Sequence, residues 1–211
     1  MNREIGKNFS CNQKKSKRNK SDFYQTPPSM INQLLDFNDF NYNKKVLEPA
    51  CGNLSIVKEL KKRFNPKNMT YFDIKPINIT DCVDIEGVNF LTISNNVFND
   101  IDYIITNPPY SLAFEFIQHS KKIAREKFAM LLPLNYLHGK KRYDKIWQDN
   151  KFPLEKIYVF VRYPLLTEEV RDDGKYNTGM MVYAWFVWNK LIANQNKKPE
   201  INWIDNDKFV L

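Results

Sequence analysis

Apolar residues along this chain fall into short runs, and several of these runs alternate with stretches of helical spacing. The runs have the length of buried strands, whereas the stretches between them repeat every three to four residues. Strands are predicted at residues 46–48, 69–74, 101–106, 127–132, 156–163, 180–188 and 201–204, helices at 54–64 and 111–125, and a basic helix or loop at 139–148. Strand–helix alternation followed by consecutive strands predicts an α/β fold whose sheet is mostly parallel with an antiparallel edge strand.

The polar residues that follow the run at 101–106 carry the strongest chemical signal. The sequence there is Asn107-Pro108-Pro109-Tyr110. Two prolines offer no N–H donor and stop both strand and helix, so the Asn107 amide and the Pro108 carbonyl can point into a cleft. Two such acceptors suit an exocyclic amine, and Tyr110 offers a flat face for a ring. The alternative interpretation is a structural strand-to-helix turn.

A second pattern precedes it at the end of the first strand. Residues 46–53 combine an apolar lead, Glu48 and a turn with Gly52, and a helical pattern follows. Strand, glycine-bearing turn and helix form the first unit of nucleotide-binding folds. Glu48 would repel phosphate and suits an ammonium or sulfonium ligand instead. Asp73 lies 25 positions after Glu48 at a strand end, which favours a carboxylate on ribose hydroxyls. An ordinary turn and a solvated acid are the alternatives.

Composition narrows the class of protein. The 211 residues suit one domain at 21–211, and no apolar run approaches the ~20 residues of a membrane helix. The three cysteines are scattered, which predicts a reducing cytoplasm and no zinc site. The net charge of +8 predicts an acidic partner. Seven of the cationic side chains lie in residues 1–20, which we expect to be a disordered arm that seeks phosphates, or a solubilising tail.

The motifs together resemble a known family. Glu48-Pro-Ala-Cys-Gly52, then Asp73, then Asn-Pro-Pro-Tyr, in this order, resemble S-adenosylmethionine-dependent amino-methyltransferases, above all DNA adenine-N6 methyltransferases. Residues 22–28 resemble the Tyr-x-Thr-Pro segment that closes over the cofactor in this family. Residues 183–188 are similar to a late strand of its small phage and mobile-element members. The resemblance covers residues 22–190 and implies a Rossmann-like class I methyltransferase fold.

The resemblance also implies roles for individual residues. Catalytic roles fall on Asn107, Pro108, Pro109 and Tyr110. Contacts with S-adenosylmethionine fall on Tyr24, Thr26, Pro27, Glu48, Pro49, Ala50, Gly52, Asp73, Ile74, Asn89 and Phe90. Contacts with nucleic acid are expected from Lys140, Lys141 and Arg142, and Tyr163 is expected to cover the target base unless it is simple edge-strand packing. No metal is implied.

Two positions depart from the family's pattern. Asn53-Leu54 stands where a second small residue or glycine is usual, and Asn89 stands where the family has aspartate. Three functions therefore remain: a DNA adenine-N6 methyltransferase, a methyltransferase acting on RNA adenine or protein glutamine, and a non-catalytic nucleic-acid-binding relative. The sequence predicts no separate recognition domain, which leaves four alternatives for target recognition: short target sites, relaxed specificity, a homodimer or a separate specificity protein.

Overall fold

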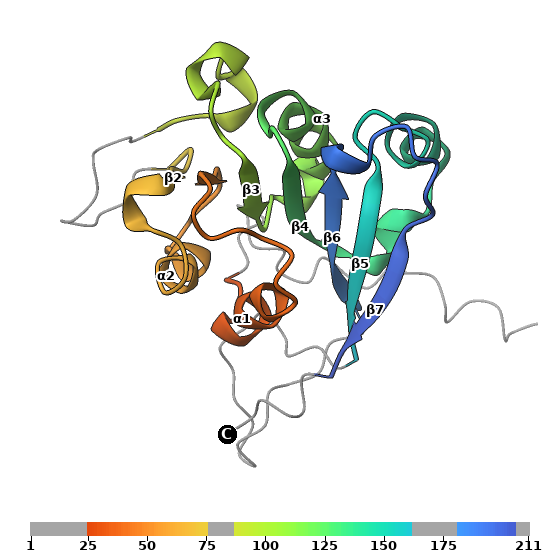
Figure 1. Ribbon diagram of the computed structural model, residues 1–211, viewed down its shortest axis with the longest axis horizontal. Coiled ribbons are helices and arrows are strands. Elements are labelled where there is room, and N and C mark those ends of the chain that lie inside the picture. The colour runs from red at the N-terminus through yellow and green to blue at the C-terminus, as the bar shows by residue number, and fades with distance from the viewer. Residues whose placement is uncertain (1–24, 76–86, 162–180, 206–211) are drawn as a thin grey trace, which may run out of the picture.

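The computed structural model describes residues 25–75, 87–161 and 181–205, which form a single sheet flanked by helices (Figure 1). Within these residues, seven strands lie in the order β2-β1-β3-β4-β6-β5-β7. The strands are β1 (Val46–Glu48), β2 (Met69–Tyr71), β3 (Tyr103–Thr106), β4 (Lys127–Pro133), β5 (Leu154–Phe160), β6 (Tyr183–Asn189) and β7 (Glu200–Ile204). The first four pair in parallel, β6 runs antiparallel to β4 and β5, and β7 is parallel to β5.

The predicted α/β fold with a mostly parallel sheet is confirmed. The antiparallel strand β6 lies inside the sheet, because β5 pairs with its outer side and β7 forms the edge beyond β5. The α-helices are α1 (Pro28–Asp36), α2 (Ser55–Leu60), α3 (Ala113–Ile123) and α4 (Lys140–Arg142), and α4 continues into the π-helix η6 (Tyr143–Trp147). The 3₁₀ helices are η1 (Pro66–Asn68), η2 (Phe90–Thr92), η3 (Asn95–Phe98), η4 (Tyr110–Leu112), η5 (Leu134–Leu137) and η7 (Lys190–Ile192).

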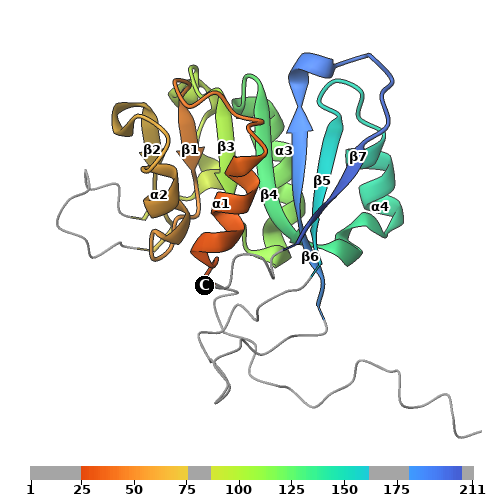
Figure 2. The ribbon, with the colours of Figure 1, turned by 60° about the horizontal axis from the view of Figure 1, so that its bottom comes forward.

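Helices cover both faces of the sheet because successive strand residues point to opposite sides (Figure 2). Val46, Tyr103 and Ile105 pack with α1 and α2 on one face. Leu47 and Ile104 pack with α3 and η6 on the other. None of the described helices has both the length and the apolar character that crossing a membrane requires.

The strand order also fixes where a ligand can bind. The chain leaves β1 through α2 toward β2 on one side of the sheet, and leaves β3 through α3 toward β4 on the other. The order therefore reverses between β1 and β3, and the loops at their carboxyl ends diverge. In open α/β sheets the crevice at this point receives ligands.

Candidate active site

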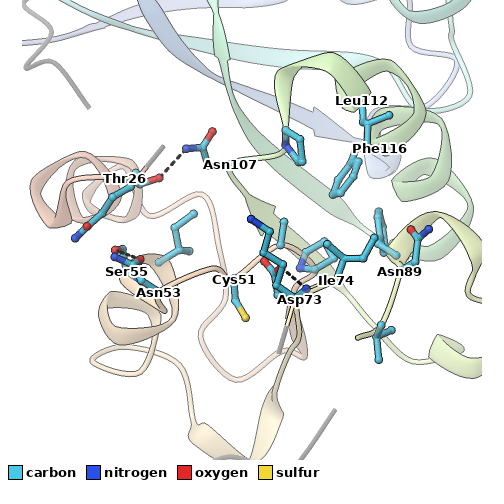
Figure 3. A pocket seen from close by; sticks show the side chains of 18 residues that line it. Thr26, Cys51, Asn53, Ser55, Asp73, Ile74, Asn89, Asn107, Leu112 and Phe116 are labelled. Atoms are coloured by element: carbon cyan, nitrogen blue, oxygen red, sulfur yellow. Dashed lines mark hydrogen bonds between the residues drawn. The ribbon is translucent and has the colours of Figure 1, made fainter. Parts of the chain in front are cut away.

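A pocket opens at the carboxyl ends of β1, β2 and β3, where Figure 3 shows its lining side chains. Residues from five separate segments converge on it. They are Gln25, Thr26, Pro49, Ala50, Cys51, Asn53, Ser55, Ile56, Asp73, Ile74, Lys75, Val88, Asn89, Phe90, Asn107, Pro109, Leu112 and Phe116. One wall thus comes from the segment before α1, and the opposite wall comes from η2 and the start of α3.

Glu48 ends β1 and lies beneath this lining, not within it. Only 1% of its surface is exposed. Its Oε1 atom accepts hydrogen bonds from the Ala50 amide at 3.1 Å and from the Thr106 hydroxyl at 2.6 Å. The carboxyl therefore ties the turn after β1 to the end of β3. Burial raises the pKa of Glu48 to about 8, although both hydrogen bonds act to lower it, and the charge of Asp73 adds to the increase.

Asp73 follows β2 and is held by two backbone amides. Its Oδ2 atom accepts from Gly52 N and its Oδ1 atom accepts from Lys75 N, both at 2.9 Å. Gly52 has a φ of 47°, in the left-handed region that glycine adopts without strain. Each carboxylate oxygen keeps a second lone pair, so Asp73 can accept hydrogen bonds from two hydroxyls of a ligand.

The turn between β1 and α2 ends on an unusual backbone conformation. Leu54 has a φ of 66° and a ψ of 20°, in the left-handed region that favours glycine. The side chain is nevertheless buried, in a cluster with Cys51 and Val57. Asn53 Oδ1 accepts from the backbone and hydroxyl of Ser55, so its side chain closes the turn. Asn53 and Leu54 therefore still form the turn, although Leu54 adopts a backbone conformation that is strained for leucine.

Apolar side chains form the other end of the pocket. Phe90 and Phe116 pack with ring centroids 5.0 Å apart, and Figure 3 shows Ile74 and Leu112 around the same cavity. Asn89 Oδ1 accepts from Leu91 N at 3.0 Å and so caps η2. This end can hold a planar ring between apolar groups, with the Asn89 amide at its edge.

Asn107 occupies the position directly after β3 and faces the pocket. Its Nδ2 group donates to the Thr26 hydroxyl oxygen at 3.0 Å, across 81 positions of sequence. Thr26 is 3% exposed. Pro108 is buried, and the ring of half-buried Tyr110 lies 5.6 Å from that of Tyr183. The arrangement can present an amide to a ligand or substrate in the pocket.

The structure brings many of the predicted site residues together. Those that line the pocket are Thr26, Pro49, Ala50, Asp73, Ile74, Asn89, Phe90, Asn107 and Pro109. Those outside the lining are Pro27, Glu48, Gly52, Pro108 and Tyr110. Tyr24, Tyr163 and the arm at 1–20 lie outside the described residues. The roles assigned to all of these residues stay predictions.

Sequence reasoning assigned no role to half of the lining. Those residues are Gln25, Cys51, Asn53, Ser55, Ile56, Lys75, Val88, Leu112 and Phe116. Most of them are adjacent in sequence to predicted site residues, and that proximity could have identified them as pocket residues. Leu112 and Phe116 lie four positions apart at the start of α3, and this helical spacing places both on the pocket side.

The basic segment forms α4 and lies outside the pocket lining. Lys141 Nζ is 3.9 Å from the ring centroid of Phe114, in the first turn of α3. The Arg142 guanidinium lies 4.6 Å from the ring centroid of Tyr136, and its Nε donates to the His138 carbonyl at 2.7 Å. Lys140 pairs with Asp144. The aromatic contacts hold this segment in place, and its contact with nucleic acid stays a prediction. Among the described residues no three His, Cys, Asp or Glu side chains cluster as metal ligands.

No protein-family model matches the sequence. Over 171 residues the chain is 23% identical to the modification methylase CviBIII of Paramecium bursaria Chlorella virus NC1A, which covers 76% of this chain and 37% of that protein. The solved type I restriction enzyme EcoKI M protein matches with a TM-score of 0.62 and 15% identity, over 88% of this chain and 49% of that one. The chain thus spans less than half the length of these two proteins.

A shorter solved protein matches as well. Magnesium protoporphyrin IX methyltransferase from Synechocystis PCC 6803, whose structure contains bound S-adenosylmethionine, has a TM-score of 0.51 and 13% identity. The match covers 77% of this chain and 79% of that protein. The sheet order and these likenesses show that the chain has the Rossmann-like class I methyltransferase fold.

Proposed function

We propose that this chain transfers a methyl group from S-adenosylmethionine to the N6 amine of adenine in DNA. One observation carries the proposal: the Asn107 amide stands at the carboxyl end of β3, in the same pocket as Asp73. The likeness to a viral modification methylase supports DNA as the substrate. The sequence Asn-Pro-Pro-Tyr supports an amine of a planar ring as the acceptor.

The pocket residues fit S-adenosylmethionine in their chemistry and in the sequence in which they follow one another along the pocket. Asp73, fixed by two backbone amides, would accept the ribose hydroxyls. The apolar end around Phe90 and Phe116 would hold the adenine ring. The polar end with Thr26 and Asn53 would receive the methionine carboxylate and ammonium. When bound, this cofactor supplies an electrophilic methyl group on a positively charged sulfur.

The protein's own contribution is to orient the target amine. Adenine N6 is a poor nucleophile because its lone pair is delocalised into the ring. Asn107 Oδ1 and the Pro108 carbonyl would each accept one N6 hydrogen, which localises the lone pair toward the methyl group. Alignment of the reactants supplies most of the remaining acceleration. Tyr110 would stack on the displaced base, a contact worth ~1–3 kcal/mol against the cost of leaving the duplex.

DNA is the proposed partner, and the cytoplasm is the proposed location. Lys140 and Lys141 on α4 are exposed beside the first turn of α3 and would contact phosphates. A second copy of the chain or a separate specificity protein is proposed to supply recognition of the target sequence.

Methyl transfer is tested by incubating the purified protein with methyl-labelled S-adenosylmethionine and unmethylated genomic DNA. Total RNA and total protein serve as parallel acceptors. Digestion of the DNA to nucleosides, followed by mass spectrometry, should identify N6-methyldeoxyadenosine. Asn107→Ala should reduce transfer at least a hundred-fold, while calorimetry shows nearly unchanged cofactor affinity. Label on cytosine, RNA or protein in preference to DNA adenine would contradict the proposal.

A further inference from the structure

A side-chain hydrogen bond between Thr26 and Asn107 joins the segment before α1 to the segment after β3 (Figure 3). The Asn107 Nδ2 atom lies 3.0 Å from Thr26 Oγ1, and both residues line the same pocket. Thr26 is 3% exposed, so water does not compete freely for its hydroxyl. This partly buried hydrogen bond restricts the orientation of the Asn107 amide.

The direction of this hydrogen bond decides what Asn107 offers to a target. When Nδ2 donates to Thr26, the Oδ1 atom points away from Thr26, as Figure 3 shows. If the hydroxyl donated instead, the amide would have to turn over and present its NH2 group. An NH2 group cannot accept the hydrogens of an amine. The threonine hydroxyl has one proton and two lone pairs, so it can act as donor or as acceptor.

The chemistry of the pocket favours the direction in which Asn107 Nδ2 donates to Thr26, which leaves Oδ1 as the acceptor for a target amine. Figure 3 places Thr26, Asn53 and Ser55 at the end opposite Asn89. The apolar end suits the adenine ring, so the amino-acid end of S-adenosylmethionine would lie beside Thr26. Its carboxylate is a strong acceptor and would accept a hydrogen bond from the Thr26 hydroxyl. The lone pairs of Thr26 Oγ1 would then face Asn107 Nδ2.

We propose that Thr26 is a positioning residue for Asn107, and that the cofactor carboxylate sets the direction of the hydrogen bond between them. This inference rests on the proposed function. Its consequence is that cofactor binding reinforces the orientation of the Asn107 amide that the structure already shows, with Nδ2 donating to Thr26. Cofactor binding and the grip on the target are thereby coupled, and coupling of this kind is reciprocal.

Substitution of Thr26 separates the positioning role from cofactor affinity. Thr26→Val keeps the shape and removes the hydroxyl, and Thr26→Ser keeps the hydroxyl. Loss of one neutral hydrogen bond corresponds to a change of roughly ten-fold in a rate or equilibrium constant. We expect Thr26→Val to lower the single-turnover rate at saturating cofactor about ten-fold, and Thr26→Ser to restore most of it. In the Asn107→Ala background, Thr26→Val should lower the rate no further. A full rate in Thr26→Val at saturating cofactor would overturn the inference.

A second readout does not depend on catalysis. The side-chain NH2 signals of Asn107 can be assigned in ¹⁵N spectra by their loss in Asn107→Ala. In the wild-type protein these signals should shift when the product S-adenosylhomocysteine, which carries the same carboxylate, is added. In Thr26→Val that shift should be lost although the ligand still binds by calorimetry. An equal shift in both proteins would overturn the coupling.

The two readouts also separate this inference from the proposed function. If the wild-type protein methylates no acceptor but the Asn107 signals respond to ligand through Thr26, methyl transfer fails and the positioning role stands. If DNA adenine is methylated and Thr26→Val keeps both the full rate and the spectral response, the function stands and the positioning role fails.

Discussion

Replacing Glu48 with glutamine should stabilise the folded protein at neutral and alkaline pH. Burial raises the pKa of this carboxyl from an ordinary 4.5 to about 8. Between these two values the folded state keeps a proton that the unfolded chain has released, so stability falls as pH rises. Each pKa unit is worth ~1.36 kcal/mol, and the cost is therefore roughly 3 kcal/mol at pH 7 and roughly 4–5 kcal/mol at pH 9.

Glutamine is the closest mimic of the protonated carboxyl. Its Oε1 atom can still accept from the Ala50 amide and the Thr106 hydroxyl. Its NH2 group replaces the Oε2 atom, which is buried and accepts no hydrogen bond from the described residues. Urea denaturation of both proteins at pH 5, 7 and 9 gives the difference in unfolding free energy. The advantage of Glu48→Gln should be smallest at pH 5 and grow with pH. A difference that is independent of pH would refute the assignment of this pKa.

Three further predictions concern the ligand pocket and its surroundings. Asp73→Asn should weaken S-adenosylmethionine binding ten- to a hundred-fold by calorimetry, because hydrogen bonds to a charged group are worth ~1.5–3 kcal/mol. Leu54→Gly should cost less unfolding free energy than Leu60→Gly, by about 1–2 kcal/mol, because glycine relieves the left-handed backbone at 54 but not the helical one at 60; equal costs would contradict the strain. Deletion of residues 1–20 should flatten the salt dependence of DNA affinity and leave cofactor affinity unchanged, since seven cationic side chains are removed.

The strands of the sheet could be predicted because their signals are local. The apolar run at 101–106 stops at Asn107-Pro108, and β3 ends at Thr106 in the structure. The helical spacing at 54–64 predicted α2, which begins at Ser55. Parallel strands separated by helices bring their carboxyl ends to one edge of the sheet. The convergence of Asp73 and Asn107 follows from that rule, and both line the pocket.

The contacts between distant segments could not be predicted in the same way. The bond between Thr26 and Asn107 depends on how α1 packs against the sheet, across 81 positions. The place of Glu48 beneath the lining depends on the Thr106 hydroxyl of a neighbouring strand. The inner position of β6 depends on β5 pairing with β6 on the side away from β4. In each case the sequence is compatible with several interaction partners, and tertiary packing selects one of them.

The two sides of the pocket are held by different means. Asp73 and Asn107 follow strands of the sheet, and the Glu48–Thr106 and Asp73–Gly52 hydrogen bonds join the loops at the ends of those strands. Thr26 precedes a helix, and its position depends on how α1 is anchored to the sheet.

That anchor is visible in the core. The fully buried Trp185 of β6 donates its indole N–H to the Met30 carbonyl at 2.9 Å, in the first turn of α1. Met30 N in turn donates to Pro27 O at 3.1 Å, one residue after Thr26. The segment that carries Thr26 is therefore tied to the antiparallel strand β6, which pairs with β4. The antiparallel strand thus does more than extend the sheet: it anchors the segment in which Thr26 contacts Asn107, the residue proposed to bind the target amine.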